Sequence, residues 1–196
     1  MPPFKQLSVS QYYKGFKYLG IATALFATLP LFSNILPDTA QGYAFPPLGD
    51  VETFGRGAVF VLVLVATFVV FLCRNFSEKT KNKTVVFLWI LAVVCCIGYL
   101  AAATRFIRTV PIPSTGKSVS VSVGYERTDF ASSLGQVSDI DLLRMRSPEE
   151  EEIQKLWTFG SLIWARIALW TSYCLLLSAI AAIFGFGALQ QAENRP

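Results

Sequence analysis

The sequence predicts an all-α membrane protein with four transmembrane helices and a small α+β extramembrane insert between the third and the fourth. Hydrophobic residues make up 53% of the 196 residues and charged residues 15%, whereas soluble domains average about 25% charged residues. The apolar residues gather in four blocks, and the stretch "SVSVSV" after the third block alternates as a strand does. We divide the chain into residues 1–104 with three spans, the insert at 105–160, and residues 161–196 with the last span and a short tail.

Each apolar block is long enough to cross a bilayer, which takes about 20 residues in a helix. The predicted spans are residues 16–36, 57–73, 84–104 and 161–189. The first block is too long for the apolar core of a signal peptide, and no small-residue cleavage site follows it, so we interpret it as a retained span. Four helices this apolar would leave too little polar chain to cover them in water, which favours the membrane.

Lysine and arginine in the short loops predict the orientation, because cytoplasmic loops carry an excess of both. The N-terminal lead carries three lysines, and the loop after the second span carries four cations against Glu78. The loop between the first two spans carries three acids against Arg56. We therefore expect both termini in the cytoplasm and the insert outside. The insert carries seven cations of its own, but longer loops follow the charge rule less strictly.

The insert begins with a predicted β-hairpin. Pro111 and Pro113 exclude a helix and mark the first strand as an edge, and Gly116 suits the turn. In the second strand, residues 118–123, valines face one side and serines the other. A single hairpin is marginally stable in water. We expect cover for it from the helices that follow, from the membrane surface or from other copies of the chain.

Two short helices are predicted after the hairpin. Ser138 is a suitable N-cap for "DIDLLRMR", and Ser147, Pro148 and Glu150 fit a capping box at the start of "SPEEEEIQKLW". The apolar side of the second helix either covers the valines of the hairpin or rests on the lipid interface; it consists of Ile153, Leu156 and Trp157.

The charged residues near the fourth span have two interpretations each. Four consecutive glutamates suit the positive end of a helix, or they form an acidic ring at the mouth of a pore in a symmetric assembly; they are Glu149, Glu150, Glu151 and Glu152. Arg166 lies between Trp164 and Trp170. Such an arginine anchors a helix at the membrane boundary, or it serves a water path, since charge within a membrane is costly.

One face of the fourth span carries small and weakly polar residues at steps of three and four. This seam consists of Thr171, Cys174, Ser178, Ala182 and Gly185. Helices in a bilayer associate through small residues and polar contacts. The seam therefore packs within one subunit, joins two subunits or lines a narrow aqueous path.

The residue inventory argues against catalysis. The chain has no histidine, which excludes Ser/His/Asp and Cys/His catalysis and the two-histidine zinc helix. The four cysteines lie within apolar runs or at their edges, a placement that indicates neither a disulfide framework nor a zinc site. We expect no enzymatic activity, no metal and no cofactor; a membrane enzyme using the acids near residues 139–152 is the weakest hypothesis.

Several stretches of the chain carry a family resemblance. They are "FPPLGD" before the second span, the short basic loop after it, "VPIPSTGK" leading into "GYE", and "LWTFGS" at the start of the fourth span. With them the chain resembles small four-span bacterial membrane proteins of anti-phage and conflict operons, such as the effectors of CBASS and Hailong systems. The resemblance implies a homo-oligomer, with a tetramer as the favoured stoichiometry, that forms a pore in the bacterial inner membrane when a partner enzyme supplies a nucleotide or oligonucleotide.

The expected orientation limits where such a ligand binds. A cytoplasmic nucleotide cannot reach an external insert, so an anionic ligand would meet the basic loop, which a symmetric ring multiplies. Its cations are Arg74, Lys79, Lys81 and Lys83. The same residues also serve as simple topology signals. The competing hypothesis is a membrane sensor or accessory subunit without a pore, which binds a partner through the hairpin edge.

Overall fold

The computed structural model describes two long helices and the insert that joins them. The continuous described ranges are residues 78–112 and 117–193, with side chains between 80 and 186. A few earlier residues are also described: Gly42, Pro46, Pro47, Phe60, Val61, Leu64, Val65 and Phe68. The first predicted span therefore lies outside the described residues, and so does most of the second.

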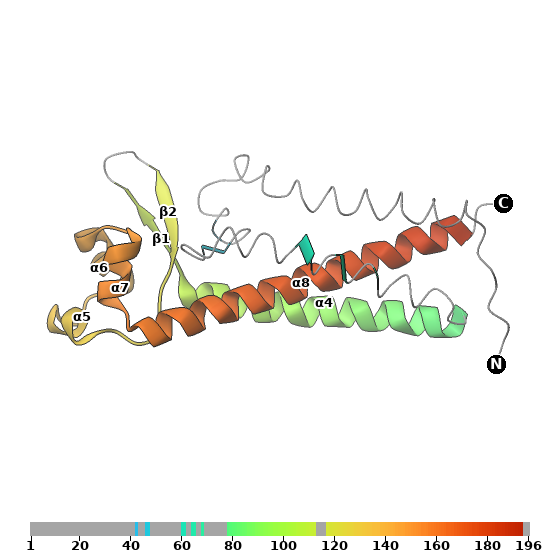
Figure 1. The fold of residues 1–196 in the computed structure, drawn as a ribbon, viewed down its shortest axis with the longest axis horizontal. Helices are drawn as coiled ribbons and strands as arrows, with labels where there is room; N and C mark the ends of the chain where they lie inside the picture. Colours follow the sequence, from blue (N-terminus) through green and yellow to red (C-terminus); the bar gives the residue numbers. More distant parts are fainter. Residues whose placement is uncertain are drawn as a thin grey trace.

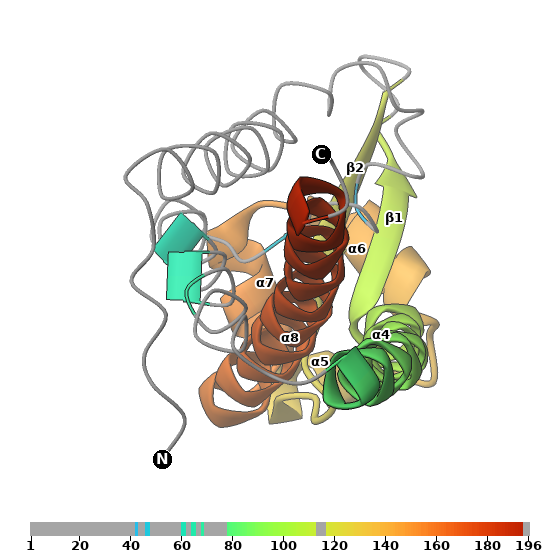
Figure 2. The same ribbon diagram turned by 90° about the vertical axis from the view of Figure 1, so that its right-hand side faces the viewer.

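Helices α4 (Glu78–Phe106) and α8 (Phe159–Glu193) run side by side in opposite directions (Figures 1 and 2). Both are long and apolar enough to cross a membrane, over Thr80–Phe106 (27 residues) and Phe159–Phe186 (28 residues). They correspond to the third and fourth predicted spans. Helix α4 begins at Glu78, earlier than the predicted boundary at residue 84, because glutamate and lysine continue a helix well although they end the apolar run.

The outer surface of α4 is apolar and open. Seven of its large side chains are each at least 55% exposed: Val86, Phe87, Trp89, Ile90, Val93, Val94 and Ile97. The described residues of the second predicted span are helical, and their apolar side chains are exposed as well. Surfaces this apolar are stable against hydrocarbon and unfavourable against water, which supports a membrane location for both segments.

The two long helices pack through small and aromatic residues. Near the insert, Tyr99, Ala103 and Leu169 are buried together, and the rings of Tyr99 and Tyr173 lie 5.5 Å apart between centroids. A second contact lies further from the insert, where Ala182 and Phe186 of α8 are buried with Val85 and Leu88 packed against them. Small residues let the helix backbones approach closely, as is usual in bilayers.

The insert is a two-stranded antiparallel sheet covered by short helices. Strands β1 (Ile107–Pro111) and β2 (Ser118–Ser122) pair with Ile107 opposite Ser122 and Pro111 opposite Ser118, which confirms the predicted hairpin. Val121 and Val123 are buried in one core, together with Ile153, Leu156 and Trp157. The following helices therefore cover the valine side, as one of the predicted alternatives stated, and Trp157 is a core residue of the insert.

Three helices follow the hairpin: α5 (Asp129–Ser133), α6 (Asp139–Arg146) and α7 (Glu150–Leu156). The first is not predicted from the sequence; its N-cap Thr128 accepts a hydrogen bond from the Ala131 amide. Ser138 caps α6 as predicted, accepting from the Asp141 amide at 3.2 Å.

The predicted capping box at the start of α7 is wrong. Ser147 ends α6, because its amide donates to the Leu143 carbonyl at 3.0 Å and its φ is 95°. Helix α7 starts at Glu150, and its N-cap Glu149 makes no side-chain capping bond. The carboxylate of Glu150 does not return to Ser147, because it pairs with an arginine of α8.

Candidate functional site

Arg166 of α8 joins the insert to the membrane helices. Its Nη2 lies 2.7 Å from both carboxylate oxygens of Glu150, the first residue of α7, and its Nε donates to Ser122 Oγ in β2 at 2.9 Å. The Arg166 side chain is 14% exposed and that of Glu150 26%, so both charges are partly withdrawn from water. Hydrogen bonds of this charged kind are the stronger ones in proteins. In this structure Arg166 therefore does not reach toward the membrane boundary, as one sequence interpretation held, but joins three elements.

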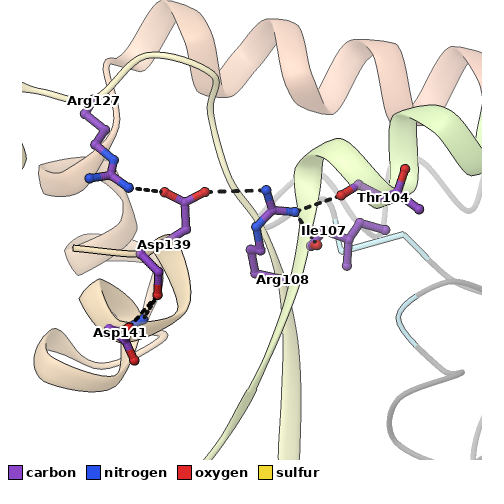
Figure 3. A network of polar contacts seen from close by, with 7 residues as sticks. Thr104, Ile107, Arg108, Arg127, Asp139 and Asp141 are labelled. Carbon is purple, nitrogen blue, oxygen red and sulfur yellow. Dashed lines mark hydrogen bonds and ion pairs between the residues drawn. The ribbon is translucent and has the colours of Figure 1, made fainter. Parts of the chain in front are cut away.

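A second polar network ties α6 to the end of α4. Asp139 accepts from Arg127 Nη2 at 2.7 Å and lies 3.5 Å from Arg108 Nη2 (Figure 3). Arg108 Nη1 also donates to the carbonyls of Thr104 and Ile107 at 2.9 and 3.0 Å. Carbonyls at a helix C-terminus lack partners within the helix, and a nearby arginine satisfies them. Asp139 thus fixes the arginine that caps α4.

The start of α8 is built into the insert. The amide of Thr158 donates to the Glu126 carbonyl at 3.0 Å, and Ser161 Oγ bonds to the carbonyls of Glu126 and Thr158 at 3.1 and 3.0 Å. Leu162 is buried in the core of the insert. Gly124 packs so closely that a Cβ added there would overlap Ser161 Oγ. The first turn of α8 and the insert therefore form one packed unit.

A polar stripe runs down α8 from this junction. It consists of Arg166, Trp170, Cys174 and Ser178, whose steps of four place them on one face of the helix. Cys174 is 5% exposed. Trp170 Nε1 and Ser178 Oγ are buried and have no hydrogen-bond partner among the groups that the structure describes.

Ser178 differs from other hydroxyl residues in the long helices. Ser172 Oγ bonds to the carbonyls of Ala168 and Leu169 at 2.7 and 3.0 Å, and Thr104 Oγ1 bonds to the Ala101 carbonyl at 3.0 Å. Such back-bonding satisfies a hydroxyl within its own helix. A buried polar group without a partner is costly, and most such groups in proteins are satisfied by water or another polar group. The stripe therefore has the chemistry of a surface that faces water or a polar partner.

The structure divides the seam predicted on α8. Thr171 is exposed, Cys174 is buried, and Ser178 and Gly185 are half-buried. Thr171 therefore lies apart from the buried members, and the stripe continues from Cys174 and Ser178 toward Arg166. The signal that sequence reasoning missed is the step of four that includes Arg166 and Trp170.

The predicted basic cluster does not form one exposed surface among the described residues. Arg74 lies outside the described residues, and Lys79 is placed on the first turn of α4 by its backbone alone. Lys81 is 7% exposed, whereas Lys83 is exposed. Because α4 includes these positions, Lys79, Lys81 and Lys83 lie on a helix instead of in the predicted loop.

The four consecutive glutamates have different roles. Glu150 pairs with Arg166, while Glu149 and Glu151 are exposed. Glu152 accepts from Lys155 Nζ at 2.6 Å, and this hydrogen bond holds the pKa of the Glu152 carboxyl below its usual 4.5. Among the described residues, Glu150 and Glu152 are therefore paired with cations, whereas the exposed Glu149 and Glu151 have no ion pair of this kind.

The described part of the chain contains acidic and cysteine side chains, the residue types that can ligate metals. No three histidine, cysteine, aspartate or glutamate side chains gather there as metal ligands, and Cys95, Cys96 and Cys174 are free thiols. Comparison of the chain with protein-family models, curated proteins and solved structures finds no match.

Proposed function

We propose that this chain is an integral membrane protein whose copies assemble into a channel or pore, with the polar stripe of α8 along the conducting path. The observation that carries the proposal is a pair of buried polar atoms on that stripe, Trp170 Nε1 and Ser178 Oγ, which have no hydrogen-bond partner among the described residues. A polar group without a hydrogen-bond partner is costly in hydrocarbon. Polar residues at membrane depth are tolerated where they line a water-filled cavity.

The contact between two extramembrane segments supports the expected topology. A Cβ added to Gly42 would overlap the side chain of Ser120 in β2, so the segment between the first two predicted spans meets the insert. Two segments that meet outside the membrane lie on one side of it, and an even number of crossings separates them. This supports spans at residues 57–73 and 84–104 and a multi-pass chain. The side of the membrane rests on the cations of the short loops, from which we propose that both termini lie on the cytoplasmic side of a bacterial inner membrane.

The proposal also includes how copies of the chain assemble and which ligand opens the pore. The open apolar face of α4 offers a surface for lipid and for neighbouring copies, and a closed symmetric ring such as a tetramer is a usual way to enclose a path. The resemblance to anti-phage effectors adds the role: the pore disrupts the inner membrane when a nucleotide or oligonucleotide made by a partner enzyme binds. The proposed contacts for that anion are the exposed Lys83 and the neighbouring cations Arg74 and Lys79, whereas Lys81 is buried.

The conducting path is tested by accessibility and flux together. In a chain without native cysteines, single cysteines at Ser178 and at Leu175 are matched probes, because Leu175 is one turn away and 55% exposed. Purified protein in liposomes should pass ions, and a membrane-impermeant thiol reagent should modify position 178 and block the flux, leaving position 175 unmodified. A monomeric protein that passes no ions, or equal inertness of both positions, would contradict the proposal.

A non-pore sensor or accessory subunit is the second candidate. Figure 1 shows β1 and β2 lying beside α6 and α7 and reaching beyond them at one end, and Val119 near that end is 36% exposed. A strand edge of this kind binds a partner by adding a further strand. Recovery of one partner in equal amount with the chain, without ion flux from liposomes, would favour this function over the channel.

A further inference from the structure

We infer that the Glu150–Arg166 ion pair is a latch through which the insert holds α8 in its closed position, so that separation of the pair opens the path along the stripe. The inference rests on the proposed channel and names its regulation.

Arg166 lies where the insert ends and the stripe begins. One turn before it, Leu162 is buried in the core of the insert. One turn after it, Trp170 carries the first polar atom of the stripe that has no partner in the described part of the chain. Glu150 and Ser122 bind its guanidinium from α7 and β2. A displacement of α7 therefore acts on α8 at the head of the stripe.

The insert is also attached to α4, so it sets how the two long helices lie against each other. Helix α4 continues directly into β1 at Ile107, and the Val123 amide donates to the Phe106 carbonyl at 2.8 Å. With α4 fixed to the hairpin, the ion pair of Arg166 holds α8 to that same body. Loss of the pair leaves the first turn of α8 attached and frees the next turns to move against α4.

Arg166 has a second favourable state. The apolar window Phe159–Phe186 has 28 residues, about 42 Å at 1.5 Å per residue, which exceeds the ~30 Å of hydrocarbon in a bilayer. Arg166 lies near the end of this window that carries the insert. Its long side chain can therefore reach water without Glu150. Two discrete arrangements of one side chain are what a switch requires.

The test compares two neighbouring glutamates. Glu150→Gln keeps the shape of the side chain and removes the charge that binds Arg166, and Glu151→Gln makes the same change at an exposed position on the same helix. In proteoliposomes, basal ion flux should rise on the order of tenfold for E150Q, the equilibrium effect of losing one charged hydrogen bond, and stay at the wild-type level for E151Q. The exchanged pair E150R/R166E should return the flux toward wild type.

Hydrogen exchange gives a second measurement that does not depend on ion flux. It distinguishes an ion pair that does not control flux from a protein that forms no channel. Hydrogen exchange of the protein in lipid nanodiscs should speed up for the amides of 150–156 and 163–170 in E150Q and remain unchanged in E151Q. Ser122→Ala, which removes one small hydroxyl and keeps the ion pair, should give a smaller change in the same amides. Equal exchange and equal flux in E150Q and E151Q would overturn the latch while leaving a conducting wild type intact. Faster exchange in E150Q, with no flux from any variant, would overturn the channel and the gating role but keep the contact.

Discussion

Replacement of Gly124 by alanine tests how tightly the insert is packed onto the membrane helices. Gly124 lies between β2 and α5 and faces the first turn of α8. A Cβ added there would overlap Ser161 Oγ and would lie 3.0 Å from Trp157 Cβ and 3.2 Å from the Leu162 backbone nitrogen. A backbone atom cannot move aside as a side chain does, so the whole junction must shift.

The expected loss follows from these contacts. Overpacking in a well-packed core costs about 1–3 kcal/mol. A displaced Ser161 hydroxyl also gives up the one proton that it donates, shared between two backbone carbonyls, at about 1 kcal/mol. Gly124→Ala should therefore lower the free energy of unfolding by about 2–4 kcal/mol. Gly160→Ala is the matched control, since a Cβ there meets nothing within 4 Å and alanine favours a helix by about 0.5–1 kcal/mol.

The assay is thermal unfolding of the purified chain in detergent, followed by tryptophan fluorescence. For a chain of this size about 1 kcal/mol corresponds to about 2–4 °C, so Gly124→Ala should melt about 5–15 °C below wild type while Gly160→Ala melts at or above it. Adding Ser161→Ala to the first variant should restore part of the loss, because the nearest obstacle is gone. If Gly124→Ala and Gly160→Ala melt together, the insert does not pack on α8 as described.

Three further predictions concern the core, the membrane face and one carboxyl group. Trp157→Ala should lower the free energy of unfolding by about 3–5 kcal/mol, because the side chain is 1% exposed, whereas Trp164→Ala, 63% exposed, should change it by about 0.5 kcal/mol in detergent; similar losses would refute the placement of Trp157. Ile97→Arg puts a charge on the open face of α4 and should raise the free energy of insertion by about 2.5–3.5 kcal/mol, so less protein should resist alkaline extraction from membranes; unchanged retention would argue that this face meets water. Lys155→Met should return the pKa of Glu152 toward 4.5 in a carboxyl NMR titration, since the Lys155 bond lowers it; that stabilisation is present above pH 4.5 and disappears as the pH falls through the folded-state pKa, and an unmoved pKa would show that the bond is absent in solution.

The hairpin could be predicted because its signals are local, whereas its cover could be predicted only as one of several alternatives. Alternation of serine and valine places one residue type on each side of a strand, and the prolines limit where the first strand pairs. The apolar side of α7 could cover the hairpin valines, and in the structure it packs against Val121 and Val123. Helix α5 escaped prediction because five residues are too few to show a helical period.

The distant partners of Glu150 and Asp139 could not be predicted from the residues nearby in the sequence. Glu150 fits a capping box by its spacing from Ser147, yet it binds Arg166, 16 residues away, while Ser122 binds the same arginine from 44 residues away. Local spacing and a distant partner compete for one carboxylate, and the charged partner contributes more than a cap. Asp139 is similar: its place in the first turn of α6 suits the helix dipole, but nothing nearby in the chain indicates that it also fixes the arginine that caps α4.

The connections between the insert and the long helices decide how the molecule can move. Helix α4 passes into β1 without an intervening residue, and only Trp157 and Thr158 separate α7 from α8. Trp157 is buried in the insert, and the Thr158 amide is bonded to the Glu126 carbonyl, so neither connection has the free residues that a hinge uses. A ligand or partner that displaces the insert must therefore tilt or rotate α4 and α8 with it, or break the contact at Arg166. This is why a partner-binding insert and a gated path are compatible in one chain: the surface that would bind a partner is mounted directly on the helices that would line the path.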